Sequence, residues 1–170
     1  MVMIAKEEPW LRGTLQESPA VTRAVLHALD MAREDVMAAC DGLTAEELFA
    51  RPDGLTPLSF QLRHIPGSLD RLLAYAEGKQ LSDAQKAAMR AEMEDGGSAK
   101  ALLAAFLQGL LDAERRVHAM ADANLEEPRK VGRKELPTSV GGLLVHCADH
   151  TSRHVGQVVT TAKLLRNRRE

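Results

Sequence analysis

The sequence predicts an all-α protein, a four-helix bundle with a long crossover between its second and third helices. Three observations support this fold class. Apolar residues recur at helical spacing in four long segments, no segment alternates in the manner of a β-strand, and aromatic residues make up only 3% of the chain. A core this poor in aromatic residues must be aliphatic, which favours closely packed helices. We therefore expect four long helices and no sheet.

The first long helix is predicted to follow Ser18-Pro19, which has the pattern of an N-cap and an N1 proline. Apolar residues then recur at helical spacing up to about Cys40, and Asp41-Gly42 ends the helix. The capping-box sequence Thr44-Ala-Glu-Glu47 predicts a short helical turn within residues 44–50.

The second long helix is predicted to open at Thr56-Pro57 and to close at Gly78. The crossover that follows contains another capping signal at Ser82, which predicts a helical segment over residues 82–94. Gly96-Gly97 then breaks this segment. About twenty residues thus separate the second helix from the third.

Ser98 predicts the start of the third helix, which continues through about Ala123. Residues 124–135 are polar and are expected to carry the chain across the bundle. The fourth helix is predicted to start at Pro137-Thr138-Ser139 and to end at about Leu165.

Length and composition indicate one ordinary globular domain covering residues 1–170. Hydrophobic residues make up 45% and charged residues 27% of the 170 residues, with a formal net charge of −2. From Arg129 onward nine Lys or Arg face three Asp or Glu. No aromatic residues interleave with these cations, so we interpret them as a solvated helix end rather than a nucleic-acid surface.

The two cysteines, Cys40 and Cys147, lie in different segments and do not indicate a disulfide framework. The first residues include Lys6, Glu7 and Glu8 and lack the apolar stretch of a signal peptide. No apolar run approaches the roughly 18 residues needed to span a bilayer. These features predict a cytoplasmic protein without a membrane partner.

Three histidines recur at every fourth residue near the C-terminus: His146, His150 and His154. On a helix each step of four turns the side chain by about 40°, so the three share one stripe. Two imidazoles at i and i+4 can bind one metal ion. His146 lies about 12 Å along the axis from His154, and we therefore rank it as a residue near the site rather than a ligand.

A third ligand must come from another helix, and His64 is the candidate because it lies at a similar depth in the second helix. Three neutral imidazoles leave open positions on a divalent ion, as in catalytic sites. Helical histidine pairs are also common on exposed or structural faces, so the spacing alone leaves both interpretations open. Imidazole ligands suit zinc, nickel, copper and iron alike.

Two segments resemble the DinB/YfiT-like superfamily. They are Arg63-His64-Ile-Pro-Gly-Ser68 with its continuation to Gly78, and His150-x3-His154-x-Gly156-Gln157. The resemblance implies a four-helix bundle, often a homodimer, that holds a divalent ion such as zinc or nickel, with iron as a further candidate. Matched residue by residue, the implied ligands are His64, His150 and His154. Relatives with assigned activities include thiol-dependent S-transferases and isomerases and metal-dependent hydrolases.

Four further residues bear on this interpretation. Pro66 lies within the second helix, and its ring is expected to kink the helix close to His64. Gly156 is expected to allow close approach of a neighbouring helix, and Gln157 to form a hydrogen bond inside the bundle. Cys147 is interpreted as a small buried residue, with a redox or ligand role as the alternative.

The leading functional hypothesis is a metal-dependent enzyme that activates a small thiol or a water molecule for attack on an electrophilic small molecule. The alternative is a non-catalytic, dimeric binding or stress-response bundle whose metal is structural or absent. A role in DNA binding is a third, weaker alternative. We expect a homodimer, because the helices are more apolar than one core requires. The sequence shows no obvious general base, since Asp149 points away from the His150 stripe and Glu77 lies far along its helix.

Overall fold

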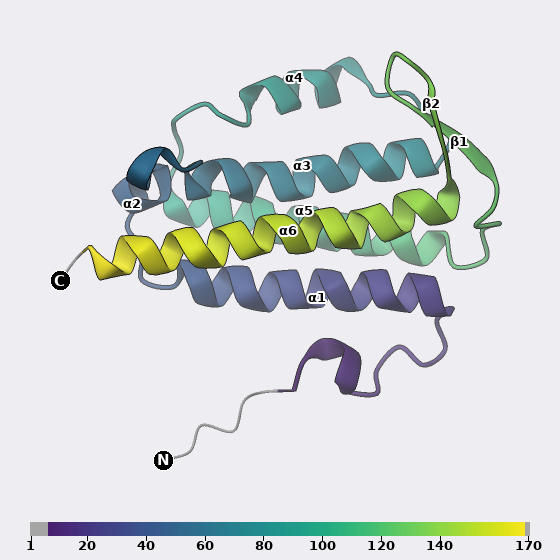
Figure 1. The fold of residues 1–170 in the computed structure, drawn as a ribbon, viewed down its shortest axis with the longest axis horizontal. Helices are drawn as coiled ribbons and strands as arrows, with labels where there is room; N and C mark the ends of the chain where they lie inside the picture. Colours follow the sequence, from purple (N-terminus) through teal and green to yellow (C-terminus); the bar gives the residue numbers. More distant parts are fainter. Residues whose placement is uncertain (1–6, 169–170) are drawn as a thin grey trace.

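The computed structural model describes residues 7–168 and shows a four-helix bundle (Figure 1). The long helices are α1 (Ala20–Cys40), α3 (Leu58–Ala76), α5 (Ala99–Ala119) and α6 (Val140–Asn167). Helix α3 packs between α5 and α6, and α1 contacts the same two helices on the opposite side. The all-α fold class predicted from the sequence is confirmed.

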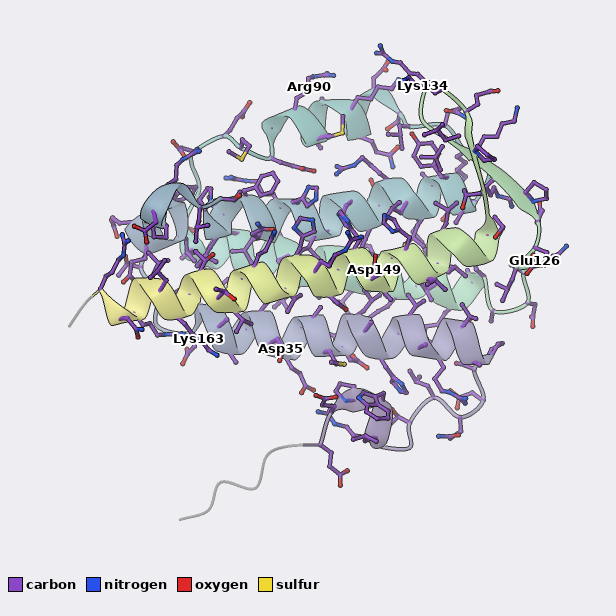
Figure 2. All side chains as sticks on the ribbon, in the orientation of Figure 1. Asp35, Arg90, Glu126, Lys134, Asp149 and Lys163 are labelled. Carbon is purple, nitrogen blue, oxygen red and sulfur yellow. The ribbon has the colours of Figure 1, made fainter. Side chains whose placement is uncertain are left out.

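Two short helices lie between the long ones. Helix α2 (Ala45–Phe49) follows α1, and α4 (Asp83–Ala91) lies in the long crossover between α3 and α5. Figure 1 shows α4 outside the bundle, alongside α3. No residue of α4 itself is buried, and Arg90 points from it away from the bundle (Figure 2).

Hydrogen-bonded caps explain why several helices begin where they do. Thr44 and Ser82 each form a complete capping box, with Glu47 and Gln85 respectively. Ser98 and Ser139 accept hydrogen bonds from backbone N–H groups in the first turns of α5 and α6. These four signals were predicted correctly.

The two proline-containing starts differ from the prediction by one residue. Pro19 and Pro57 occupy the N-cap positions of α1 and α3, and neither helix has a side-chain cap. The predicted N-caps at Ser18 and Thr56 are therefore wrong, because Pro19 and Pro57 have extended ψ values of 150° and 154° and so precede the first helical residue instead of occupying it. Helix α5 ends at Ala119, earlier than predicted, and turns continue the chain to Ala123.

The prediction of no sheet is wrong for the segment before α6. Strands β1 (Pro128–Val131) and β2 (Leu136–Ser139) form an antiparallel hairpin. Its tip requires left-handed backbone at Gly132 and Glu135, with φ values of 70° and 50°. The strands have four residues each and lack apolar alternation, so the usual strand signal is absent.

The core is aliphatic, as the composition predicts. Phe106 is fully buried among leucine and valine side chains, and one continuous apolar cluster includes residues from all four long helices. Within residues 7–168, no helix is both long and apolar enough to cross a membrane.

Candidate metal centre

Three imidazoles converge between α3 and α6. His64 comes from α3, and His150 and His154 come from successive turns of α6. One ring nitrogen of each lies within 4.8 Å of one ring nitrogen in each of the others. His64 Nε2 is 3.1 Å from His150 Nε2, and the ring centroids of His64 and His154 are 4.4 Å apart. All three side chains are half-buried.

Pro66 does not move His64 out of this cluster. Helix α3 continues from Leu58 to Ala76 through Pro66 as a single element. The ring of Pro66 lies against Gly109 of α5, where the absence of a side chain leaves room for it. From the sequence, a kink at Pro66 could have turned His64 away from His150 and His154. The convergence of the three rings shows that His64 still points towards them.

The ring of His64 is held by a buried carboxylate and by an aromatic ring. Its Nδ1 lies 2.7 Å from Glu92 Oε2, and the other oxygen of Glu92 accepts a 2.6 Å hydrogen bond from Arg71. Phe60 stacks on the His64 ring at 4.9 Å between centroids. Because a carboxylate beside Nδ1 favours the proton on that atom, Nε2 is left with its lone pair for a ligand.

The ring of His154 is held by two amides. Its Nδ1 lies 2.8 Å from Gln61 Oε1 and 2.9 Å from Gln157 Oε1, and the Gln61 amide nitrogen donates to that same Gln157 oxygen. Both neighbours of Nδ1 are acceptors, so the proton is on Nδ1 and the Nε2 lone pair is free. The expected hydrogen bond of Gln157 is thus present, although the residue lies at the surface between α3 and α6.

The environment disfavours the charged forms of His150 and His154. Burial, followed by the neighbouring histidines His154 and His64, lowers the pKa of His150 to about 4. Burial also lowers the pKa of His154. Burial acts to raise the pKa of Glu92, but the hydrogen bonds from His64 and Arg71 outweigh it and lower that pKa. The site therefore combines two imidazoles whose neutral form is favoured, His150 and His154, with an ionised carboxylate behind His64.

These residues fit a divalent metal ion. Two ligands at roughly 2.0–2.1 Å from a tetrahedral zinc ion would lie about 3.4 Å apart, close to the 3.1 Å between the two Nε2 atoms. Neutral imidazoles are the form that binds metal, and outward hydrogen bonds on Nδ1 are typical of metal-ligating histidines. His64, His150 and His154 could therefore hold an ion with positions left open.

His146 and Cys147 lie outside the cluster. The His146 side chain is 46% exposed, with Nδ1 3.7 Å from Asp149. Asp149 is on the exposed surface of α6 (Figure 2), where it accepts a hydrogen bond from Arg153. Cys147 is fully buried in the core, and burial raises the pKa of its thiol to about 12. A packing role for Cys147 fits this environment.

A cavity of about 410 Å³ lies beside the cluster. Its lining includes the two amides that hold His154, Gln61 and Gln157, together with Arg153 and Gly156. The three imidazoles do not line it themselves, so the cavity approaches the site from the His154 side. Its volume is within the usual range for small-molecule sites.

Gly156 does not have the role that the sequence suggested. A Cβ at this position would meet no atom within 4 Å, so no neighbouring helix approaches it closely. It borders the cavity beside His154 and a second cavity between α1 and α6. The prediction of close helix packing at Gly156 is wrong, because α6 turns this face away from the core.

Glu92 and Gln61 are the site residues that the sequence analysis missed. Glu92 belongs to the crossover, 28 positions after His64, and no spacing rule connects the two. Gln61 precedes His64 by three residues and thus shares its helix face, a signal that pattern reasoning could have used.

The four-helix bundle and the three convergent histidines on two adjacent helices place this protein in the class of candidate metal-binding helical bundles. The model of the DinB superfamily matches residues 28–158 of this chain, a span that contains all three histidines. The chain therefore belongs to the DinB superfamily, as the resemblance in two segments indicated. A comparison with curated proteins found no match.

Proposed function

We propose that this protein is a metal-dependent enzyme in which His64, His150 and His154 hold a divalent ion, with zinc and nickel as the leading candidates. The observation that carries the proposal is the convergence of the three ring nitrogens within 4.8 Å, on neighbouring helices. Membership of the DinB superfamily supports metal binding. When bound, the ion would supply a Lewis acid that lowers the pKa of a bound thiol or water.

The chain's own residues have defined roles in this proposal. Glu92 and the two glutamines orient the imidazoles, each through Nδ1. The cavity beside Gln61 and Gln157 would receive an electrophilic small molecule. No thiol of the chain lies in the cluster, since both cysteines are buried elsewhere. The nucleophile is therefore a small thiol or water from solution.

A conjugation assay tests the thiol branch of this proposal. Metal-loaded protein is mixed with cysteine and 1-chloro-2,4-dinitrobenzene, and formation of the carbon–sulfur bond with release of chloride is followed by absorbance. A parallel assay with 4-nitrophenyl acetate tests attack by water. We expect a rate above background in one of the two assays and its loss in His150→Ala. Background rates with every metal and in both assays would contradict an enzymatic role.

The alternative is a bundle in which a metal serves the fold and no reaction occurs. Measuring metal content and melting temperature for the wild type and His150→Ala distinguishes a catalytic site from a structural one. An open catalytic site should lose its metal in His150→Ala with little loss of fold, whereas a structural site should lose both.

A further inference from the structure

The crossover between α3 and α5 reaches the candidate metal centre through a single buried side chain. Helix α4 contributes no buried residue, yet Glu92, which directly follows it, is only 6% exposed. An acidic side chain is rarely this buried unless it is paired. We therefore expect specific polar partners to hold the Glu92 side chain inside the bundle.

Three features of α3 form a seat for the Glu92 carboxylate. Arg71 donates to one oxygen at 2.6 Å, and His64 Nδ1 lies 2.7 Å from the other. Between these residues, Gly67 has no side chain, and a Cβ there would come within 2.9 Å of Glu92 Oε1. The seat thus comprises a cation, a ring N–H and a missing side chain on one face of α3.

The same segment is attached to α3 at a second point. The Arg63 guanidinium donates to the backbone carbonyls of Glu94 and Gly96 at 2.6 and 2.7 Å. Residues 92–96 are therefore docked by polar contacts from α3, while α4 itself remains on the surface. A segment with few buried apolar contacts opens at low free-energy cost.

We propose that Glu92 is a positioning residue that couples metal binding at His64 to docking of residues 92–96. A carboxylate on the Nδ1 side of a ligating imidazole fixes the ring and increases its basicity. With the segment docked, His64 is oriented for the ion, and with the segment open, the ring loses this support. Coupling is reciprocal, so metal binding must in turn favour the docked segment. This inference rests on the proposed metal site.

Zinc affinity provides the first test. Competition with a chromophoric chelator gives the dissociation constant for the wild-type protein and for Glu92→Gln, with Glu94→Gln as the matched control. Glu94 is exposed and contacts Arg63 through its backbone only. We expect Glu92→Gln to weaken zinc binding by about 10- to 100-fold and Glu94→Gln to leave it unchanged.

Gly67→Ala tests the same seat without altering Glu92. The added Cβ would lie 2.9 Å from Glu92 Oε1 and 3.1 Å from Arg71 Nη1, so the ends of these two side chains must shift, while alanine is a better helix former than glycine. We expect weaker zinc binding with no loss of helix content. Gly156→Ala is the matched control in α6, since its Cβ meets nothing within 4 Å, and it should bind zinc as the wild type does.

Hydrogen exchange measures the reciprocal effect in the unmodified chain. We expect zinc to slow amide exchange in residues 92–96 of the wild type and to have a much smaller effect there in Glu92→Gln. Wild-type zinc affinity in both Glu92→Gln and Gly67→Ala, or unchanged exchange on adding zinc, would overturn the coupling but leave the metal site standing. Absence of metal binding by the wild type would overturn both.

Discussion

The ring of Pro66 in α3 lies against Gly109 in α5, so closely that a Cβ on Gly109 would be 2.3 Å from Pro66 Cβ. The two residues allow α3 and α5 to pack together close to His64, which precedes Pro66 by two residues in α3. Proline inside a helix and glycine inside its neighbour are each unfavourable alone. Here their shapes are complementary.

Gly109→Ala should therefore destabilise the protein. Nearby backbone, including Pro66 Cα at 3.5 Å from the added Cβ, limits any relaxation. Overpacking of this kind costs about 1–3 kcal/mol, which exceeds the gain of up to about 1 kcal/mol in helix propensity. Urea unfolding measures the difference. Gly156→Ala, which adds the same methyl group to open space, should be neutral or stabilising, and a similar result for both variants would refute the packing argument.

The metal-free protein should lose stability as the pH falls from about 6.5 to about 4. His150 takes up a proton near its ordinary pKa of 6.5 in the unfolded chain, but only near pH 4 in the folded one. Between these values the unfolded state binds more protons, so acid favours unfolding, and above pH 6.5 this contribution is constant. Urea unfolding at several pH values should show a shallower dependence in His150→Ala. His118→Ala, which alters an exposed histidine outside the cluster, is the control for the loss of an imidazole.

Both thiols of the folded protein should resist alkylation. Burial raises the pKa of Cys40 to about 11 and that of Cys147 to about 12, and the thiolate is the reactive form. We expect little iodoacetamide labelling at pH 8 under native conditions and two labels per chain in denaturant, measured by mass spectrometry. Rapid labelling of Cys147 in the folded protein would support the redox or ligand role that its burial argues against.

We expect the protein to form a homodimer. The sequence-based argument from apolar content has a counterpart on the surface, where Leu111 is 44% and Val145 56% exposed. Val145 lies on α6 and is the position at which an interface there can be tested. Sedimentation velocity at micromolar concentration should show a dimer, and Val145→Glu should shift it towards the monomer if α6 forms the interface. A wild-type monomer under these conditions would refute the expectation.

The bundle was predictable because its signals are local. Helical spacing of apolar residues and side-chain caps act within one or two turns, and the caps at Ser98 and Ser139 appear in the structure where the sequence suggested. The hairpin was not predicted because its four-residue strands lack the apolar alternation by which strands are usually found. It is instead held by hydrogen bonds between the two strands. Arg129 helps to fix it by donating to the carbonyl of Ala76 at the end of α3, a contact that no local rule anticipates.

The site was predictable only in part for the same reason. His150 and His154 share a helix stripe, and the position of His64 in α3 matched their depth. Glu92 could not be found in this way, because its approach to His64 depends on how the crossover folds back over Gly67. The hydrogen bonds on the Nδ1 side of His64 and His154 depend on how different helices and loops pack together. The spacing of residues along one helix does not contain this information.

Metal titration tests the central claim most directly. Metal-free wild-type protein is titrated with zinc and with nickel by calorimetry, beside His150→Ala and the control His118→Ala, and circular dichroism monitors the fold of each. We expect one ion per chain for the wild type and His118→Ala, and a large loss of affinity for His150→Ala with its helix content unchanged. Failure of the wild type to bind either ion, or equal binding by folded His150→Ala, would contradict the assignment of His64, His150 and His154 as a metal centre.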